Sequence, residues 1–108
     1  MLGVTVSITQ YIDDAQPGWV ECKLLDAWGH EWLFKDKVPM FTSLMLDKHS
    51  TYPQSGVIAC QVVKKYFDAD GKEIITIDTQ SPWYVESTTG ETRFDVSSEQ
   101  LIEFDFDE

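Results

Sequence analysis

Cysteine and histidine are scarce in this sequence, and their scarcity excludes several kinds of site. The 108 residues include only two cysteines, Cys22 and Cys60, and two histidines, His30 and His49. Two cysteines are too few for a disulfide scaffold, and no C-x-x-C or H-x-x-x-H pair is present from which a zinc site could be built. Each cysteine lies on the apolar face of a predicted strand, so both are expected in the core. The sequence therefore predicts no metal and no cofactor.

Basic residues and long apolar runs are also few. Lys and Arg number 8 against 19 Asp and Glu, which gives a formal net charge of −11. A nucleic-acid partner requires a basic surface and an anionic membrane repels an acidic protein, so neither partner is expected. No apolar run approaches the roughly 20 residues of a membrane span, and the N-terminal segment MLGVTVSITQYIDD lacks the features of a signal peptide. We predict a cytoplasmic protein with reduced thiols.

Catalytic and phosphate-binding motifs are missing as well. The 6 glycines form no phosphate-binding loop, and both G-x-S-x-G and H-E-x-x-H are absent. Asp68, Asp70 and Gly71 match the start of a calcium loop, but Ile77 occupies the position at which such a loop has glutamate. The same residues are typical of a hairpin turn, which is the preferred interpretation. Without a catalytic constellation, the chain is predicted not to be an enzyme.

Along much of the sequence, apolar and polar residues alternate with a period of two, and turn residues interrupt this alternation at short intervals. Ser97 and Gln100 form a capping box that predicts one short helical turn before the last strand. No long helical pattern occurs, so we expect a single all-β domain over residues 1–108. It is predicted as a small barrel of SH3-like type or a strongly bent antiparallel sheet. The alternation indicates about seven strands, among them 4–8, 57–67, 83–87 and a final strand from residue 102 onward.

Acidic charge is concentrated in the C-terminal part of the chain. Residues 79–108 contain 8 acidic residues and one base, whereas residues 1–78 contain 11 acidic and 7 basic residues. In a strand, Trp83 and Tyr84 would point to opposite faces, so one ring has to leave the core; Trp19 and Trp28 raise the same expectation. The plainer interpretation of this acidic region is a solvent-exposed charged face that resists aggregation. Exposed aromatic rings beside carboxylates equally indicate a protein interface. The predicted partner-binding residues are Trp83, Tyr84, Glu86, Glu91, Asp105 and Asp107.

Three segments of the chain resemble a family of small, acidic, functionally unassigned bacterial proteins. They are DAWGHEWLFKDKVP, YPQSGVIACQV and DTQSPWYVESTTGETRFDV. They are similar to the family elements D-A-x-G-x-E-x-x-F…K-V-P, Y-P-x-x-G-x-I-x-C and P-W-x-x-E-S-T-x-G-E-T-x-F-x-V, although Tyr84 stands where a related pattern has a small residue. The resemblance spans most of the chain and implies a shared fold without an activity. In type, the chain is similar to the immunity proteins of toxin–immunity systems.

These observations lead to three hypotheses about function. The first is a non-enzymatic acidic protein-binding module: a bacterial immunity protein that neutralises a basic toxin domain, plausibly a nuclease. The second is a small-ligand-binding β-barrel, in which the long predicted loop 42–56 covers a mouth lined by Trp32, Trp83 and Tyr84. The third, a hydrolase that uses carboxylates with His30 or His49, has no supporting spacing. The sequence does not predict the oligomeric state.

Overall fold

The computed structural model describes residues 1–14 and 17–105, and strands dominate this part of the chain. Two 3₁₀ turns, Val38–Met40 and Ser98–Gln100, are the only helical elements among the described residues. The all-β prediction is therefore confirmed. The strands are β1 (Leu2–Asp13), β2 (Trp19–Leu25), β3 (Glu31–Lys37), β4 (Gln54–Ala59), β5 (Gln61–Phe67), β6 (Glu73–Asp78), β7 (Arg93–Ser97) and β8 (Leu101–Glu103).

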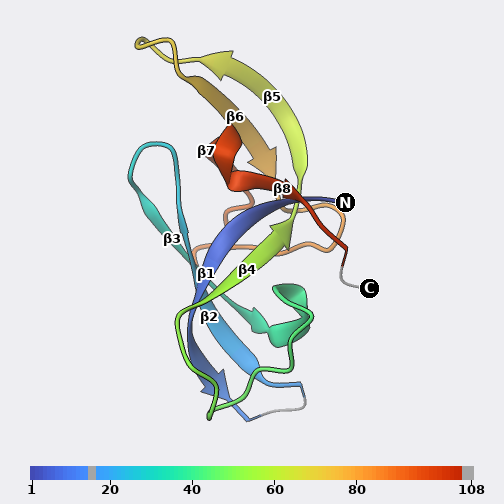
Figure 1. Cartoon of the computed structure of the whole chain (residues 1–108). Coiled ribbons are helices and arrows are strands. Elements are labelled where there is room, and N and C mark those ends of the chain that lie inside the picture. The colour runs from blue at the N-terminus through green and yellow to red at the C-terminus, as the bar shows by residue number, and fades with distance from the viewer. Residues whose placement is uncertain (15–16, 106–108) are drawn as a thin grey trace.

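The strands form two antiparallel sheets, and the described residues contain no closed barrel. The larger sheet has the order β3–β2–β1–β4, with β8 also paired to β1, and the smaller sheet has the order β5–β6–β7. The barrel, which was one of the two predicted architectures, is therefore wrong; the pairing is antiparallel, and the described residues form eight strands rather than about seven. The β5–β6 hairpin reaches away from the larger sheet (Figure 1), which makes the molecule elongated at 45 × 27 × 23 Å.

The predicted strand 57–67 is two strands, because the chain changes sheet at Cys60. Val57, Ile58, Ala59 and Cys60 are all buried, so the alternation of buried and exposed residues is lost at this point. The Cys60 amide donates a hydrogen bond to the carbonyl of Leu2 at 3.1 Å, while β5 pairs with β6 in the other sheet. Four consecutive buried residues mark the crossing between the two sheets.

Strand β1 is the centre of the larger sheet and has neighbours on both sides. It pairs with β4 over residues 3–8, with β8 over residues 2–4, and with β2 from residue 7 onward. Val4, Val6 and Ile8 are buried, as the alternation predicts. Gly3 is required where β1, β4 and the C-terminal segment meet, since a Cβ atom there would collide with the side chains of Val57 and Phe104.

One hydrophobic cluster connects the two sheets. It combines residues of β1 to β4 with Ile75, Ile77, Phe94 and Val96 of the smaller sheet. Phe34 of β3 packs edge-to-face on Phe94 of β7, with ring centroids 5.5 Å apart. Both cysteines belong to this cluster, as predicted. Within the described residues, no helix is long and apolar enough to cross a membrane.

Asp95 of β7 connects the β2–β3 turn to the smaller sheet. Its carbonyl accepts a hydrogen bond from the Ala27 amide at 2.8 Å. Its carboxylate accepts hydrogen bonds from Trp28 Nε1 at 3.1 Å, Tyr66 Oη at 2.8 Å and Thr76 Oγ1 at 2.6 Å. Partial burial alone would raise the pKa of Asp95, but these three donors and the charge of Lys64 together lower it.

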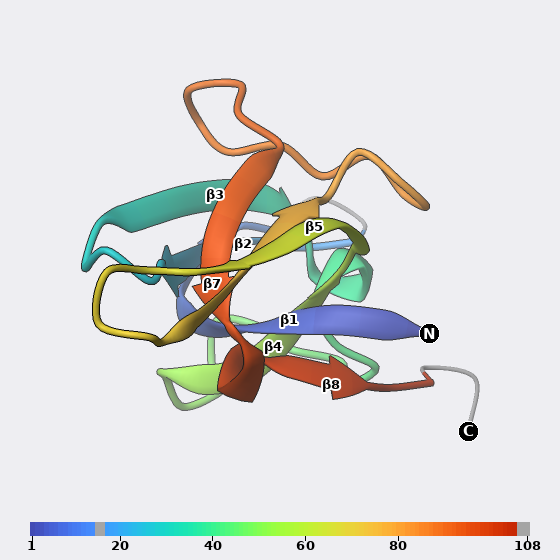
Figure 2. The same ribbon diagram turned by 90° about the horizontal axis from the view of Figure 1, so that it is seen from above.

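The predicted turns near the ends of strands are largely confirmed. Asp68–Gly71 closes the β5–β6 hairpin, with the Asp68 amide bonded to the Lys72 carbonyl at 2.9 Å and Gly71 at a φ of 80°. The capping box is present, since the side-chain Oε1 of Gln100 accepts a hydrogen bond from the Ser97 amide at 3.0 Å. The predicted strand 83–87 is wrong: residues 79–92 form a loop, which projects from the β6–β7 side in Figure 2.

Candidate partner-binding surface

The β6–β7 loop, residues 79–92, is fastened to the protein at two points. Thr79 is fully buried; its amide donates to the Thr92 carbonyl at 2.8 Å and its hydroxyl donates to the Val85 carbonyl. The Val85 amide donates back to the Thr79 carbonyl at 3.0 Å, and the Val85 side chain is fully buried. The Thr88 amide bonds the Leu33 carbonyl of β3 at 2.8 Å. These bonds hold a loop that has no strand partner.

Tyr84 is turned outward by an unusual backbone conformation. Its φ is 52°, and it is the only described non-glycine residue with a positive φ. For a residue with a Cβ atom, this conformation costs about 1–2 kcal/mol. The chain reverses there, so Val85 enters the core while both Trp83 and Tyr84 are exposed, at 36% and 55%. The expectation that one of these two rings has to leave the core is therefore met, and the second ring is exposed as well.

Glu86 lies beside Tyr84 in the same loop, two positions further along the chain. The phenol donates a hydrogen bond to Glu86 Oε2 at 3.2 Å. The negative charge of Glu86, followed by this hydrogen bond, slight desolvation and the charge of Asp78, raises the pKa of the Tyr84 phenol. An exposed aromatic ring is thus held in a region of negative potential.

A hollow of about 520 Å³ lies between this loop and the edge of the larger sheet. Trp19, at the start of β2, forms one wall, and Lys35 and Asp36 of β3 contribute charges of opposite sign. Tyr84 and Glu86 form the facing wall, together with Ser87 and Thr88. Lys35 and Asp36 were not predicted, because only the register of β3 and the attachment of the loop bring them here.

Glu91 is exposed, but its carboxylate holds the turn that ends the loop. Ser87 Oγ donates to Glu91 Oε2 at 3.0 Å, and the Thr89 hydroxyl donates to the same oxygen. These two hydrogen bonds lower the pKa of Glu91, with slight desolvation acting against them and the His30 charge assisting. Glu91 therefore shapes the loop that presents Tyr84 and Glu86.

The remaining predicted residues lie apart from Tyr84. The Trp83 ring packs edge-on against Phe104, with centroids 6.1 Å apart. Asp105 lines a separate hollow with Thr5 and Ile102. The described last strand ends at Glu103, and Asp107 lies outside the described residues, so the acidic row of Asp105 and Asp107 remains a prediction. Of the five predicted residues that the structure describes, Tyr84 and Glu86 line one hollow and Asp105 lines another.

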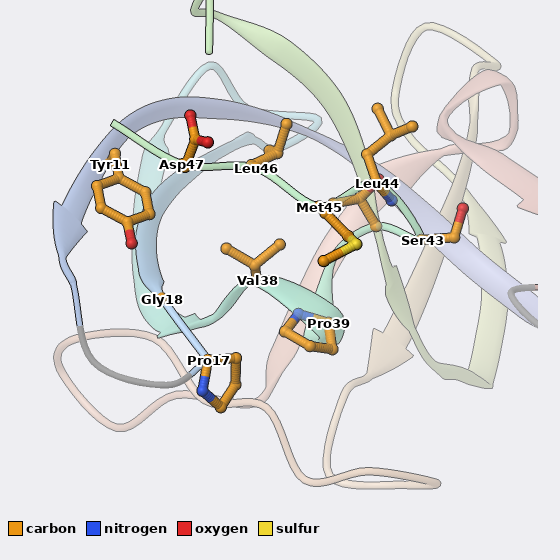
Figure 3. Close-up of a pocket in the computed structure, with 11 residues that line it drawn as sticks. Tyr11, Pro17, Gly18, Val38, Pro39, Ser43, Leu44, Met45, Leu46 and Asp47 are labelled. Carbon is orange, nitrogen blue, oxygen red and sulfur yellow. The ribbon is translucent and has the colours of Figure 1, made fainter. Parts of the chain in front are cut away.

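The described residues form no closed barrel, and Trp32 lies apart from the hollow that Tyr84 lines. Trp32 contacts the rings of His30 and Phe94, at centroid distances of 4.4 and 5.3 Å, and its Nε1 donates to Asp26 Oδ2 at 2.9 Å. It lines neither the Tyr84 hollow nor the pocket beside the loop 42–56. That pocket is walled by other residues, shown in Figure 3.

The described residues also bear on whether the chain could bind a metal ion or supply a reactive thiol. Among residues 1–14 and 17–105, no three His, Cys, Asp or Glu side chains are grouped so that they could hold a metal ion. Burial raises the pKa of the Cys60 thiol to about 11, and that of Cys22 still further. Comparison of the chain with protein-family models, curated proteins and solved structures found no match.

Proposed function

We propose that this chain is a non-enzymatic binding module for a basic protein, and that its contact surface centres on Tyr84 and Glu86. One observation carries the proposal. The loop 79–92 adopts a costly backbone conformation whose result is to expose an aromatic ring beside a carboxylate. Backbone strain of this kind persists where the surrounding structure enforces it, and it concentrates at functional sites.

The physical properties of the surface suit such a partner. A ring that is already held in place loses little conformational freedom on binding, and tyrosine is enriched among the residues that dominate interface energies. The net charge of −11 attracts a basic partner over long range and speeds encounter. A bacterial immunity protein acting on a basic toxin domain, plausibly a nuclease, fits these properties and the resemblance of the sequence.

Affinity capture from the native host tests the proposal. The wild-type protein, the variant Tyr84→Ala and the control Phe67→Ala are immobilised separately; Phe67 is 69% exposed on β5 and lies outside the proposed surface. We expect a basic protein to be retained by wild type and Phe67→Ala at low and moderate salt, and to be lost with Tyr84→Ala. Retention by all three proteins, or the absence of any basic partner, would contradict the proposal.

A further inference from the structure

We propose that the pocket beneath residues 42–47 binds a small amphiphilic molecule with an apolar body and a cationic head group. This site is separate from the surface around Tyr84. The pocket has a volume of about 550 Å³, within the range of about 300–1,000 Å³ that is typical of small-molecule sites. Val38 and Met45 extend into it and Leu46 also lines it, with Pro39 and Pro17 on one side and Tyr11 on another (Figure 3).

The loop over this pocket is fixed, yet its apolar side chains are open to water. The Thr42 amide bonds the Val38 carbonyl at 3.3 Å, and the Leu44 amide bonds Thr42 Oγ1 at 3.1 Å. Met45 is nevertheless 96% exposed and Leu44 is 55% exposed. Exposed apolar side chains around a hollow are typical of a binding site, and the flexible methionine side chain adapts to ligands of different shape.

The charged groups beside the pocket favour a cationic head group. Among the described residues that line it, Asp47 alone is charged. After burial, the largest influences on the Tyr11 phenol are the charge and hydrogen bond of Asp14 and the charge of Asp47, and all of them raise its pKa. The negative charges of Asp14 and Asp47 therefore both act on the hydroxyl of a lining residue. A cation beside an aromatic ring and a carboxylate is stabilised by both, whereas the net charge of −11 repels an anionic amphiphile.

Nuclear magnetic resonance with three matched probes tests the site. Octyltrimethylammonium, octanol and octanoate each contain a chain of eight carbons, which in octanoate includes the carboxylate carbon, and they differ in the charge of the head group. Below micellar concentrations, we expect octyltrimethylammonium to shift the Met45 methyl signal saturably, octanol to do so with lower affinity, and octanoate not to bind. The Met1 methyl, which does not line the pocket, serves as the internal control.

Two variants separate the apolar body from the head group. Met45→Lys places a cation over the opening at a side chain that is 96% exposed, so the fold is kept and binding of octyltrimethylammonium is lost; Met45→Leu retains it. Both variants lack the Met45 methyl, so binding to them is read from the methyl signals of Leu46, another lining residue. Asp47→Asn keeps an oxygen acceptor for the His49 amide, which bonds Asp47 Oδ1 at 2.8 Å, while removing the charge. This variant should lower the affinity for octyltrimethylammonium about fivefold and leave the affinity for octanol unchanged. Equal affinities for all three probes, or no saturable shift with any of them, would overturn the proposal.

Discussion

Asp95 is the residue at which two parts of the fold are joined by side-chain chemistry. Its carboxylate accepts hydrogen bonds from Trp28, Tyr66 and Thr76, which belong to the β2–β3 turn, β5 and β6. Bonds to a charged acceptor contribute more than neutral ones, but this site is only partly buried. We expect Asp95→Ala to lower the free energy of unfolding by about 2 kcal/mol, measured by urea denaturation.

The variants Tyr66→Phe and Thr76→Val each remove one donor and serve as partial versions of the same change. Each should cost less than Asp95→Ala, and the denaturant dependence of the unfolding free energy should stay the same. If Asp95→Ala changes the unfolding free energy by less than either donor variant, the carboxylate does not join the two sheets energetically.

Tyr84 allows the cost of its backbone conformation to be measured separately from its contacts. Tyr84→Ala and Tyr84→Gly both remove the ring, but only glycine adopts a φ of 52° without steric cost. We expect Tyr84→Gly to be more stable than Tyr84→Ala by about 1 kcal/mol, as thermal or urea unfolding will show. Both variants should lose the partner equally. A glycine variant less stable than the alanine variant would show that the loop does not enforce this conformation.

At the scale of the element, β5 is an edge strand that carries both exposed apolar side chains and lysines. Among the described strands it pairs only with β6, and Val62, Val63 and Phe67 are exposed at 41%, 42% and 69%. Lys64 and Lys65 lie between them, and lysine on an edge strand opposes pairing with another chain. We expect Lys64→Thr combined with Lys65→Thr to cause concentration-dependent association, detected by light scattering. Lys48→Thr with Lys72→Thr makes the same charge change outside the strands and should leave the protein dispersed.

The elements also show which parts of the structure were predictable from sequence. In β2, Val20, Cys22 and Leu24 are fully buried, because a strand with one face on the core keeps a strict period of two. The loop 79–92 has a strand-like alternation, but the bonds between Thr79 and Val85 outweigh it. The alternation of residue types gives no information about the contact between Thr79 and Val85.

The same reasoning explains the partial prediction of the candidate site. Tyr84 and Glu86 were both among the predicted residues, and they lie close together because they are only two positions apart. Lys35 and Asp36 reach the same hollow only through the register of β3 and the attachment of Thr88 to Leu33. Both features belong to the tertiary structure, which cannot be derived from a single sequence.

At the scale of the whole molecule, stability depends on carboxylates whose pKa values are lowered by folding. For Asp78 and Asp95, burial alone would raise the pKa, but hydrogen bonds and nearby cations lower it; for Glu91, hydrogen bonds lower it directly. A group with a lowered pKa binds fewer protons in the folded state. Its contribution is therefore complete above its unfolded pKa of about 4 and is lost as the pH falls through the folded value.

Comparison with Asp95→Asn isolates one of these contributions. Acid also relieves the repulsion within a protein of net charge −11, which acts in the opposite direction but equally in both proteins. We expect the difference in unfolding free energy between wild type and Asp95→Asn to be constant from pH 7 to about pH 5 and to shrink below about pH 4. Urea denaturation across this range measures it, and a difference that grows on acidification would contradict the assignment.

The final prediction distinguishes the long-range effect of charge from direct contact with a basic partner. Glu86 lies beside Tyr84, whereas Asp105 lies in a separate hollow, so their carboxylates contribute differently to one interface. The encounter rate depends on the summed field, and therefore Glu86→Gln and the double change Asp105→Asn with Asp107→Asn should both slow association and reduce its salt dependence. Only Glu86→Gln removes a group next to the anchoring ring, so it alone should speed dissociation, by about tenfold. Stopped-flow and surface-based kinetics measure the two rates. Faster dissociation in the double variant, with none in Glu86→Gln, would move the interface to the side of Trp83 and Asp105.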